Sequence, residues 1–449
     1  MDKPHYPLEP VFRRILSPFE SFLQRTTSGG IILIATTLFS LILASLVGFD
    51  AMHHFWGQTL AISVADYFHI KLSWHDWIND GLMTLFFLLV GLELKREILV
   101  GELTSLRDAA LPIFAAMGGM IVPAFIFKML NPEGEAAMGW GIPMATDIAF
   151  AVGILVLLSW RIPKNLIIFL TALAIVDDLG AVLAIALFYT AELNFFAFFT
   201  ATILFTVLVL FNRAGIRHPL PYILIGLFLW HALLLSGIHA TIAGILLAMT
   251  IPAKATYSIG LFQRRMTELN AALLTEEENI STPNSALANQ QIAAITATMA
   301  QISHAAQSPL QRMEHNLSPW VTFLIIPLFA LSNAGIDLSV IEWRSALSHQ
   351  VTLGVTLGLV LGKFSGISLF SFAAIKLGLA RLPVGVSYLH LLGAAWLGGI
   401  GFTMSLFIGQ LAFTNALYIE QAKLGILLGS ALSAVIGLSW LFVISMQKK

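Results

Sequence analysis

Long apolar runs dominate the chain and decide what class of protein it can form. Of its 449 residues, 57% are hydrophobic and only 11% are charged, whereas soluble domains carry about 25% charged residues. A helix that crosses the apolar core of a bilayer needs about 20 predominantly apolar residues, and the sequence supplies runs of this kind repeatedly. The sequence therefore predicts an all-α, polytopic membrane protein.

Twelve runs are interpreted as transmembrane helices. They cover residues 28–49, 76–97, 108–130, 137–158, 164–189, 195–212, 219–232, 236–252, 318–336, 352–376, 388–414 and 423–446. The seventh and eighth runs are short. Together the runs predict a twelve-helix domain over residues 28–446, preceded by a polar, cytoplasmic N-terminal segment, residues 1–27.

Positive charge is distributed unequally between the two sides of these helices. With the N-terminus in the cytoplasm, nineteen of the 24 Lys and Arg residues fall on the cytoplasmic side, four fall outside, and Lys363 lies within the tenth run. Cytoplasmic loops of membrane proteins carry such an excess of Lys and Arg. The asymmetry therefore predicts twelve helices with both termini in the cytoplasm, because one helix more or less would scramble it.

Two connections between the helices are long. Residues 50–75 form an external loop, whose alternation around Ala65–Asp66–Tyr67 fits a short hairpin and an irregular loop about equally well. Residues 254–317 form a cytoplasmic loop rich in Ala, Asn, Gln, Ser and Thr. We expect a short helix over residues 266–278 and a flexible remainder without chemistry of its own.

Two adjacent aspartates, Asp177 and Asp178, lie near the middle of the fifth run. A charge at the bilayer centre costs roughly 3 kcal/mol on insertion scales, and two neighbouring carboxylates disfavour each other's ionisation. Packing gives no reason for a chain to carry such a pair. The pair therefore predicts a proton or cation site inside the membrane.

Asp147 and Lys363 lie at the same predicted depth, beside the midpoints of the fourth and tenth runs. Each has a structural alternative, since Asp147 could cap or pack a helix end and Lys363 could brace the fold. Snorkelling does not account for Lys363, because roughly 17–20 Å of helix separate it from either end of its run. We expect these groups to pair with one another or with a cation.

The fourth and eleventh runs each contain Gly- or Pro-bearing sequence just before a threonine, Thr146 and Thr403. Gly and Pro weaken helical hydrogen bonding, and interrupted helices in corresponding halves point to the binding site of a transporter. The ends of half-helices carry partial charges. We therefore hypothesise that Asp147 neutralises a pair of positive N-terminal ends, and Lys363 a pair of negative C-terminal ends.

Several function classes are excluded or disfavoured by what the sequence lacks. It has no cysteine, which excludes disulfides, thiolate metal sites and cysteine nucleophiles. A net charge of −1 gives no reason to expect a nucleic-acid partner. No GxxxxGK[ST] loop is present, which argues against an ATP-driven pump. An intramembrane aspartyl protease is disfavoured because the GxGD motif is absent and adjacent aspartates lie about 100° apart on one helix. We expect no enzyme activity.

Seven segments carry a resemblance to a known family. They read TALAIVDDLGA, MATDIAFA, WINDGLMTLFFLLVGLELKRE, SGIHATIAG, PWVTFLIIPLFALSNAG, LGKFSGISLF and GIGFTMSLFI. They resemble the NhaA-type sodium/proton antiporters from about Ser28 to Trp440, except in the loop at 254–310. The resemblance implies inverted repeats, for which this family is a known example, with the fourth and eleventh helices interrupted. It also implies a bacterial cytoplasmic (inner) membrane location, a homodimer formed through the 50–75 loop, and no cofactor.

The resemblance implies a role for each charge at mid-membrane depth. Asp178 would be the main ligand of Na⁺ or Li⁺, and Asp177 the second carboxylate of the site. Lys363 resembles the family lysine that pairs with the first aspartate. Thr146 and Asp147 match the extended crossing segment of the fourth helix.

A pH-sensing group at the cytoplasmic side is also implied. It comprises Glu93, Arg96, Glu97, Arg312, Glu314 and His315, and His239 matches a separate position linked to the pH response. The alternatives are that charged residues at a helix end are simply solvated, and that His239 is a packed histidine. Gln311 stands where a family lysine is common, so we do not transfer the pH threshold of the family to this chain.

The predicted function is secondary antiport. Burial and mutual repulsion favour protonated carboxylates, and a bound cation favours ionised ones, so H⁺ and Na⁺ compete for the same oxygens. Competition produces exchange under two conditions. The site must open to one side of the membrane at a time, and the protein must seldom switch sides while the site is empty. By resemblance, the exchange is electrogenic, takes cytoplasmic Na⁺ or Li⁺ for external H⁺, is pH-regulated and serves sodium and pH homeostasis. The alternatives are a sodium-coupled solute symporter of similar fold and an ion channel.

Overall fold

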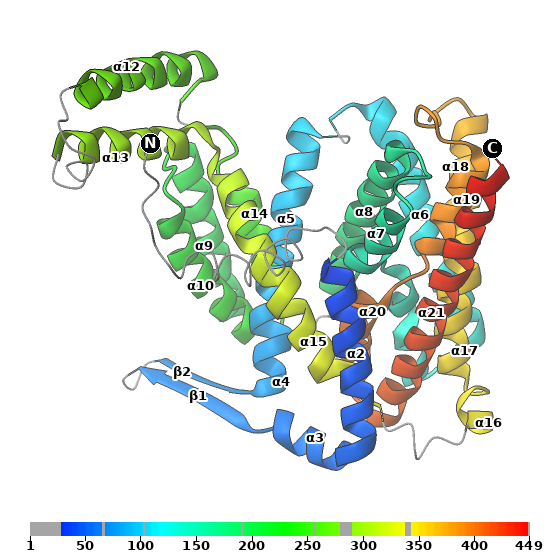
Figure 1. Cartoon of the computed structure of the whole chain (residues 1–449). Helices are drawn as coiled ribbons and strands as arrows, with labels where there is room; N and C mark the ends of the chain where they lie inside the picture. Colours follow the sequence, from blue (N-terminus) through cyan, green and yellow to red (C-terminus); the bar gives the residue numbers. More distant parts are fainter. Residues whose placement is uncertain are drawn as a thin grey trace, which may run out of the picture.

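A computed structural model of the chain describes residues 28–64, 68–101, 104–189, 193–255, 257–278, 290–336 and 343–447. In these residues the chain is predominantly helical, with one antiparallel hairpin (Figure 1). The predicted N-terminal segment, residues 1–27, lies outside the described residues.

Nine helices in the described part of the chain are long and apolar enough to cross a membrane. Six of them are formed by a single helix each: α2 (Ser28–Val47), α6 (Leu106–Leu130, apolar from Asp108), α8 (Lys164–Phe188), α9 (Phe195–Arg213), α10 (Pro219–Ser236) and α21 (Ala416–Gln447, apolar to Met446). Three are built from consecutive pieces. Glu135–Leu157 consists of η2 (Glu135–Met144) and α7 (Ile148–Leu157), Pro309–Asn333 of α14 (Pro309–Trp320), η4 (Val321–Ile325) and α15 (Ile326–Asn333), and Gln350–Lys376 of α17 (Gln350–Leu357), η5 (Gly358–Gly362) and α18 (Lys363–Lys376). A pair bent by 46°, α19 (Tyr388–Leu397) and α20 (Phe402–Ala412), is a tenth candidate. These helices are those of a polytopic membrane protein, and they overlap ten of the twelve predicted runs.

The two other predicted runs form shorter pieces. Residues 76–97 include the end of α4 (Trp74–Asp76), η1 (Trp77–Leu82) and most of α5 (Met83–Val100), which carries four charged residues between Glu93 and Glu97. Of residues 236–252, only Ile242–Thr250 form a helix, α11. The preceding helix α10 continues to Ser236, beyond its predicted end at residue 232. The count of twelve therefore stays a prediction.

The external loop at 50–75 contains a hairpin, one of its two predicted alternatives. After α3 (Phe49–Trp56), strands β1 (Thr59–Val64) and β2 (Phe68–Ser73) pair antiparallel, from Thr59 opposite Ser73 to Val64 opposite Phe68. Figure 1 shows the hairpin extending away from α3 and α4 at one end of the helices. Residues 65–67, on which the prediction of alternation rested, lie outside the described residues.

The long 254–317 loop is more regular than predicted. The expected helix over 266–278 is the second half of α12 (Ile259–Glu278), and residues 290–306, expected to be flexible, form α13 (Gln290–Ala306). In α13 the apolar residues Ile292, Ile295, Met299 and Ile302 recur at the helical period and are the less exposed ones. The two helices pack side by side (Figure 1).

Helices α6 and α18 pack closely and thereby position Lys363. A Cβ atom on Gly118 would lie 2.2 Å from the carbonyl oxygen of Gly366, and one on Gly366 would lie 2.1 Å from that of Gly118, so this backbone approach needs glycine. Lys363 begins α18 directly after η5, a π-helical turn. A π turn closes its hydrogen bonds over one residue more than an α turn, so η5 rotates α18 relative to α17.

Two of the described spans are interrupted by residues that belong to no helix. Ala145 and Asp147 are extended, with φ/ψ of −83°/152° and −78°/102°, and residues 398–401 separate α19 from α20. The segment before the first break, η2, is a 3₁₀-helix containing Pro143, and it lies in the fourth run, which the sequence predicted to be an interrupted helix starting at residue 137. These two breaks position the residues described next.

Candidate ion site

The two interrupted helices meet at Asp147. Its backbone N–H donates to the carbonyl of Ile400 at 2.7 Å. Its carboxylate accepts from the N–H of Phe150 in α7 at 3.0 Å, and from both the N–H (3.1 Å) and the hydroxyl (2.5 Å) of Thr403 in α20. The buried Asp147 carboxylate thus faces the positive N-terminal ends of two helices, the arrangement that we hypothesised from the sequence.

Lys363, Asp177 and Thr146 form a second, fully buried group. The Lys363 ammonium makes an ion pair with Asp177 Oδ2 and donates to Thr146 Oγ1 at 2.9 Å. Thr146 Oγ1 lies 2.7 Å from Asp177 Oδ2 and 2.8 Å from the carbonyl of Gly398, and its single hydroxyl proton can serve one of these acceptors at a time. The carbonyl of Gly398, at the C-terminal end of α19, is therefore contacted by Thr146. The hypothesis placed Lys363 at such ends directly, whereas its hydrogen bonds in the described structure go to two side chains.

Asp178 is completely buried, yet neither of its carboxylate oxygens has a hydrogen-bond partner among the described residues. The same holds for Oδ1 of Asp177. Adjacent residues of a helix point about 100° apart, which explains why Lys363 reaches Asp177 and makes no hydrogen bond to Asp178. Buried polar groups nearly always have partners, and an isolated buried charge is costly. Three such oxygens can be stabilised by a proton or by a cation.

Part of the predicted pH-sensing group lies together at the end of α5. Arg96 forms ion pairs with Glu97 at 3.0 Å and with Glu314 of α14 at 3.3 Å. Glu93 precedes Arg96 by three residues, and His315 and Arg312 flank Glu314 on α14, with His315 exposed. The pair between Arg96 and Glu314 joins the end of α5 to α14.

His239 is not part of that group. Its Nε2 lies 2.8 Å from the carbonyl oxygen of Tyr189, the residue that follows α8. His239 lies just before the start of α11 (Ile242–Thr250). At the C-terminal end of α11, Lys95, the neighbour of Arg96, donates to the carbonyls of Met249 (2.7 Å) and Ile251 (2.5 Å). The nine residues of α11, about 13 Å of helix, therefore separate His239 from the end of α5 that carries Lys95 and Arg96.

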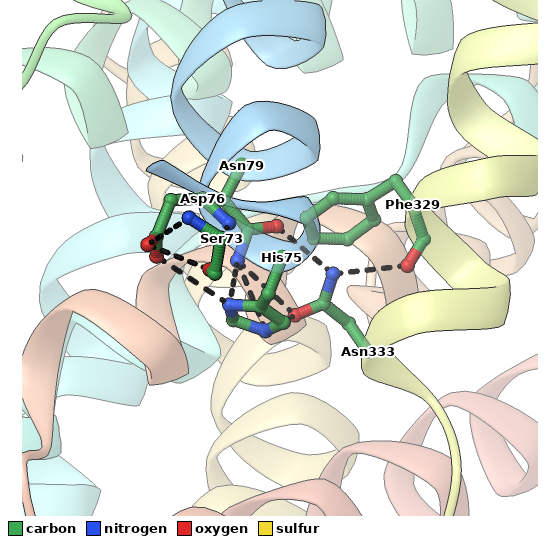
Figure 2. Close-up of polar contacts among 6 residues, drawn as sticks. All are labelled: Ser73, His75, Asp76, Asn79, Phe329 and Asn333. Carbon is green, nitrogen blue, oxygen red and sulfur yellow. Dashed lines mark hydrogen bonds and ion pairs between the residues drawn. The ribbon is translucent and has the colours of Figure 1, made fainter. Parts of the chain in front are cut away.

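Sequence reasoning missed a cluster that joins α4 and η1 to the end of α15. We call it the His75 cluster, and it comprises His75, Asn79 and Asn333. Figure 2 shows His75 Nε2 facing Asn333 Oδ1 (3.1 Å) and Asn79 Nδ2 facing His75 Nδ1 (3.1 Å). The amide nitrogen of Asn333 donates to Asn79 Oδ1 (2.9 Å) and to the carbonyl of Phe329 (3.0 Å). Asn333 is fully buried and Asn79 nearly so.

A local signal could have located this cluster. Ser73 and Asp76 form a capping box, in which the Ser73 hydroxyl accepts from the N–H of Asp76 at 3.0 Å and Asp76 Oδ2 accepts from the N–H of Ser73 at 3.2 Å. The S-x-x-D pattern that encodes it is readable in the sequence and predicts a helix start at residue 74. Ser430, a buried residue of α21 that contacts the start of α20, has no comparable signal.

Comparison with known proteins places these observations in a family context. The family described as Na⁺/H⁺ antiporter 1 matches residues 20–441. The chain is 59% identical over 440 residues to the Na⁺/H⁺ antiporter NhaA of Syntrophobacter fumaroxidans. The aligned residues cover 98% of this chain and 93% of that protein. It is 57% identical over 437 residues to the NhaA antiporter of Acidithiobacillus ferrooxidans (97% and 99% covered) and 46% identical over 441 residues to NhaA 1 of Saccharophagus degradans (98% and 94%). The resemblance read from the sequence motifs is confirmed.

Proposed function

The chain belongs to the Na⁺/H⁺ antiporter 1 family, and from this premise we propose that it exchanges cytoplasmic Na⁺ or Li⁺ for external H⁺ at Asp177 and Asp178. The observation that carries the proposal is the set of three buried carboxylate oxygens without a hydrogen-bond partner among the described residues. Hard oxygen ligands of this kind suit small, hard cations. The same oxygens accept protons, so both transported ions have one place to bind.

The exchange follows from competition at this pair. Asp178 is the main cation ligand, because both of its oxygens are available for binding. Asp177 contributes its Oδ1, while its Oδ2 faces Lys363 and Thr146. A cation entering beside Asp177 competes with the Lys363 ammonium for the same carboxylate and displaces it. Asp177 is already ionised in its pair with Lys363, so one proton comes from Asp178 and the second from the ammonium that the cation displaces. Two protons exchanged for one cation move net charge, and we therefore propose electrogenic exchange.

Alternating access uses the crossing at Asp147. The breaks at residues 145–147 and 398–401 are the places where half-helices can shift relative to one another, and Thr146 links both breaks to Asp177. Asp147 and Thr146 thus support the site without being its main ligands. A site that opens to one side at a time turns competition between ions into exchange.

The remaining features of the proposal concern the setting of the site. We propose twelve transmembrane helices in inverted repeats, both termini in the cytoplasm, location in the bacterial cytoplasmic membrane and a homodimer formed through the β1–β2 hairpin. The transporter uses no cofactor, catalyses no chemical reaction and supports sodium and pH homeostasis. The Arg96–Glu314 group and His239 are the candidates for its regulation by pH.

The test is proton movement in everted membrane vesicles that hold a pH gradient. Adding Na⁺ or Li⁺ should collapse the gradient for the native protein, while choline should not, and Asp178→Asn should abolish the response. Asp108→Asn, the same substitution at an exposed residue of α6, serves as the control and should respond normally. Sodium-driven proton movement retained by a folded Asp178→Asn variant would refute the site. A native protein that takes up Na⁺ without moving protons would instead favour the sodium-coupled symporter.

A further inference from the structure

The start of α20 is capped from outside its own segment. The first backbone N–H groups of any helix have no partner within the helix, and a Ser, Thr, Asp or Asn side chain at the N-cap position usually accepts from one of them. The N-cap residue of α20 is Gly401, which has no side chain to do this. By contrast, α7 is capped by its own N-cap residue, Asp147.

Two side chains from distant parts of the chain cap α20. The hydroxyl oxygen of Ser430 in α21 accepts from the N–H of Gly401 at 3.3 Å and from that of Phe402 at 3.2 Å. Asp147 accepts from the next N–H, that of Thr403, at 3.1 Å. Ser430 is only 5% exposed, and unpaired backbone groups in the interior of a membrane protein have little access to water.

The residues immediately before α20 connect this cap to the candidate ion site. The carbonyl of Ile400 accepts from the N–H of Asp147, and the carbonyl of Gly398 lies 2.8 Å from the Thr146 hydroxyl. Thr146 in turn contacts Asp177 Oδ2. A displacement of the start of α20 would therefore move two residues next to the carboxylate pair.

We infer that Ser430 is a positioning residue for the exchange reaction, whose hydroxyl holds the start of α20 where Asp147 and Thr146 meet it. The inference rests on the proposed function of the aspartate pair. Ser430 and Asp147 stabilise the helix start in different ways. The neutral hydroxyl accepts from two N–H groups without adding charge, and the carboxylate compensates the partial positive charge of both helix ends. Ser430 acts through α20, and none of its hydrogen bonds given by the structure is to Asp177 or Asp178.

Ser433 provides a matched control. It is the same residue type on the same helix, it is fully buried, and it also lies beside the break, since a Cβ on Gly399 would lie 2.4 Å from its Oγ. Its hydroxyl, however, has no hydrogen-bond partner among the described residues. Replacing either serine by alanine removes the same atom from a similar environment, and only the Ser430 substitution removes a cap.

The experiment measures Na⁺-driven proton release from purified protein in proteoliposomes. Loss of the Ser430 cap should raise the apparent KM for Na⁺ about tenfold in Ser430→Ala, the size expected when buried N–H groups lose their acceptor. The maximal rate should change less than about twofold, because the transported ions still reach both aspartates. Ser433→Ala should keep the native KM. Equal KM values for the two alanine variants would overturn the inference.

A second pair of variants keeps the test decisive if Ser430→Ala folds poorly. Threonine and valine have nearly the same shape, and threonine alone has a hydroxyl that can accept hydrogen bonds. We expect Ser430→Thr to show a KM close to the native value and Ser430→Val to show the tenfold rise. Identical KM values for these two would also overturn the inference. A native protein without any Na⁺-dependent proton release would refute the proposed function itself, whatever the serine variants do.

Discussion

Replacing Lys363 by methionine should destabilise the protein by leaving Asp177 as a buried charge without its counterion. Both side chains are fully buried and form an ion pair. Breaking a buried pair by removing one partner costs about 3–5 kcal/mol, because the remaining charge is uncompensated. Asp177→Asn should cost a similar amount, since it leaves the Lys363 ammonium unpaired.

The double variant Lys363→Met/Asp177→Asn should recover most of that loss. Replacing a complete buried ion pair by neutral groups is often neutral or even stabilising, and Asn retains an oxygen near the Thr146 hydroxyl, which lies 2.7 Å from Asp177 Oδ2 in the native protein. We therefore expect its free energy of unfolding to lie within about 2 kcal/mol of the native value.

Equilibrium unfolding in mixed detergent micelles with a rising fraction of dodecyl sulfate, followed by tryptophan fluorescence, measures these free energies. Lys376→Met, the same substitution at an exposed position of the same helix α18, is the control and should change the free energy by no more than about 0.5 kcal/mol. A double variant that loses the sum of the two single losses would show that the residues do not interact energetically, and the reasoning would be refuted.

Two further substitutions test the crossing and the packing around it. Thr403→Val removes the hydroxyl that contacts Asp147 at 2.5 Å but keeps the backbone N–H, so the apparent KM for Na⁺ in proteoliposomes should rise about three- to tenfold, the equivalent of one hydrogen bond; an unchanged KM would contradict this. Gly366→Ala should lower the free energy of unfolding by about 1–3 kcal/mol, because its Cβ would lie 2.1 Å from the carbonyl oxygen of Gly118. Gly260→Ala in α12, where an added Cβ atom would meet no other segment of the described chain within 4 Å, should leave the free energy unchanged or raise it by up to about 1 kcal/mol. Equal losses in the two alanine variants would count against the packing argument.

The depth of each charged residue within its apolar run predicted only that these side chains lie at one level in the membrane, and the family resemblance supplied the pairing of Lys363 with Asp177. Asp177 and Lys363 lie near the midpoints of separate runs, and in the structure they form an ion pair. In a third run, Thr146 contacts Asp177 through a hydrogen bond, whereas the neighbouring Asp147 binds Thr403. This inference works because an α-helix rises a constant 1.5 Å per residue, so position along a run measures depth.

Other features depend on contacts that one sequence does not reveal. A serine in a membrane helix is an ordinary residue, and the N–H groups that Ser430 accepts from lie 28 and 29 residues away along the chain. The π-helical turn η5 precedes Lys363 without a distinctive composition. In α13 the polar composition suggested flexibility, although the spacing of Ile292 and its apolar neighbours followed the helical period. In that segment the spacing of the apolar residues indicated a helix, whereas the overall composition wrongly indicated a flexible loop.

The His75 cluster fixes where its hydrogen atoms lie. The carbonyl of Phe329 can only accept a hydrogen bond, so Asn333 must turn its amide nitrogen toward it and its oxygen toward His75. His75 then donates from Nε2 to Asn333. The amide nitrogen of Asn79, which lies 3.1 Å from Nδ1 and 3.2 Å from Nε2, donates to the ring nitrogen that carries no hydrogen, Nδ1. The cluster therefore ties α4 and η1 to the end of α15 through one defined set of donors and acceptors.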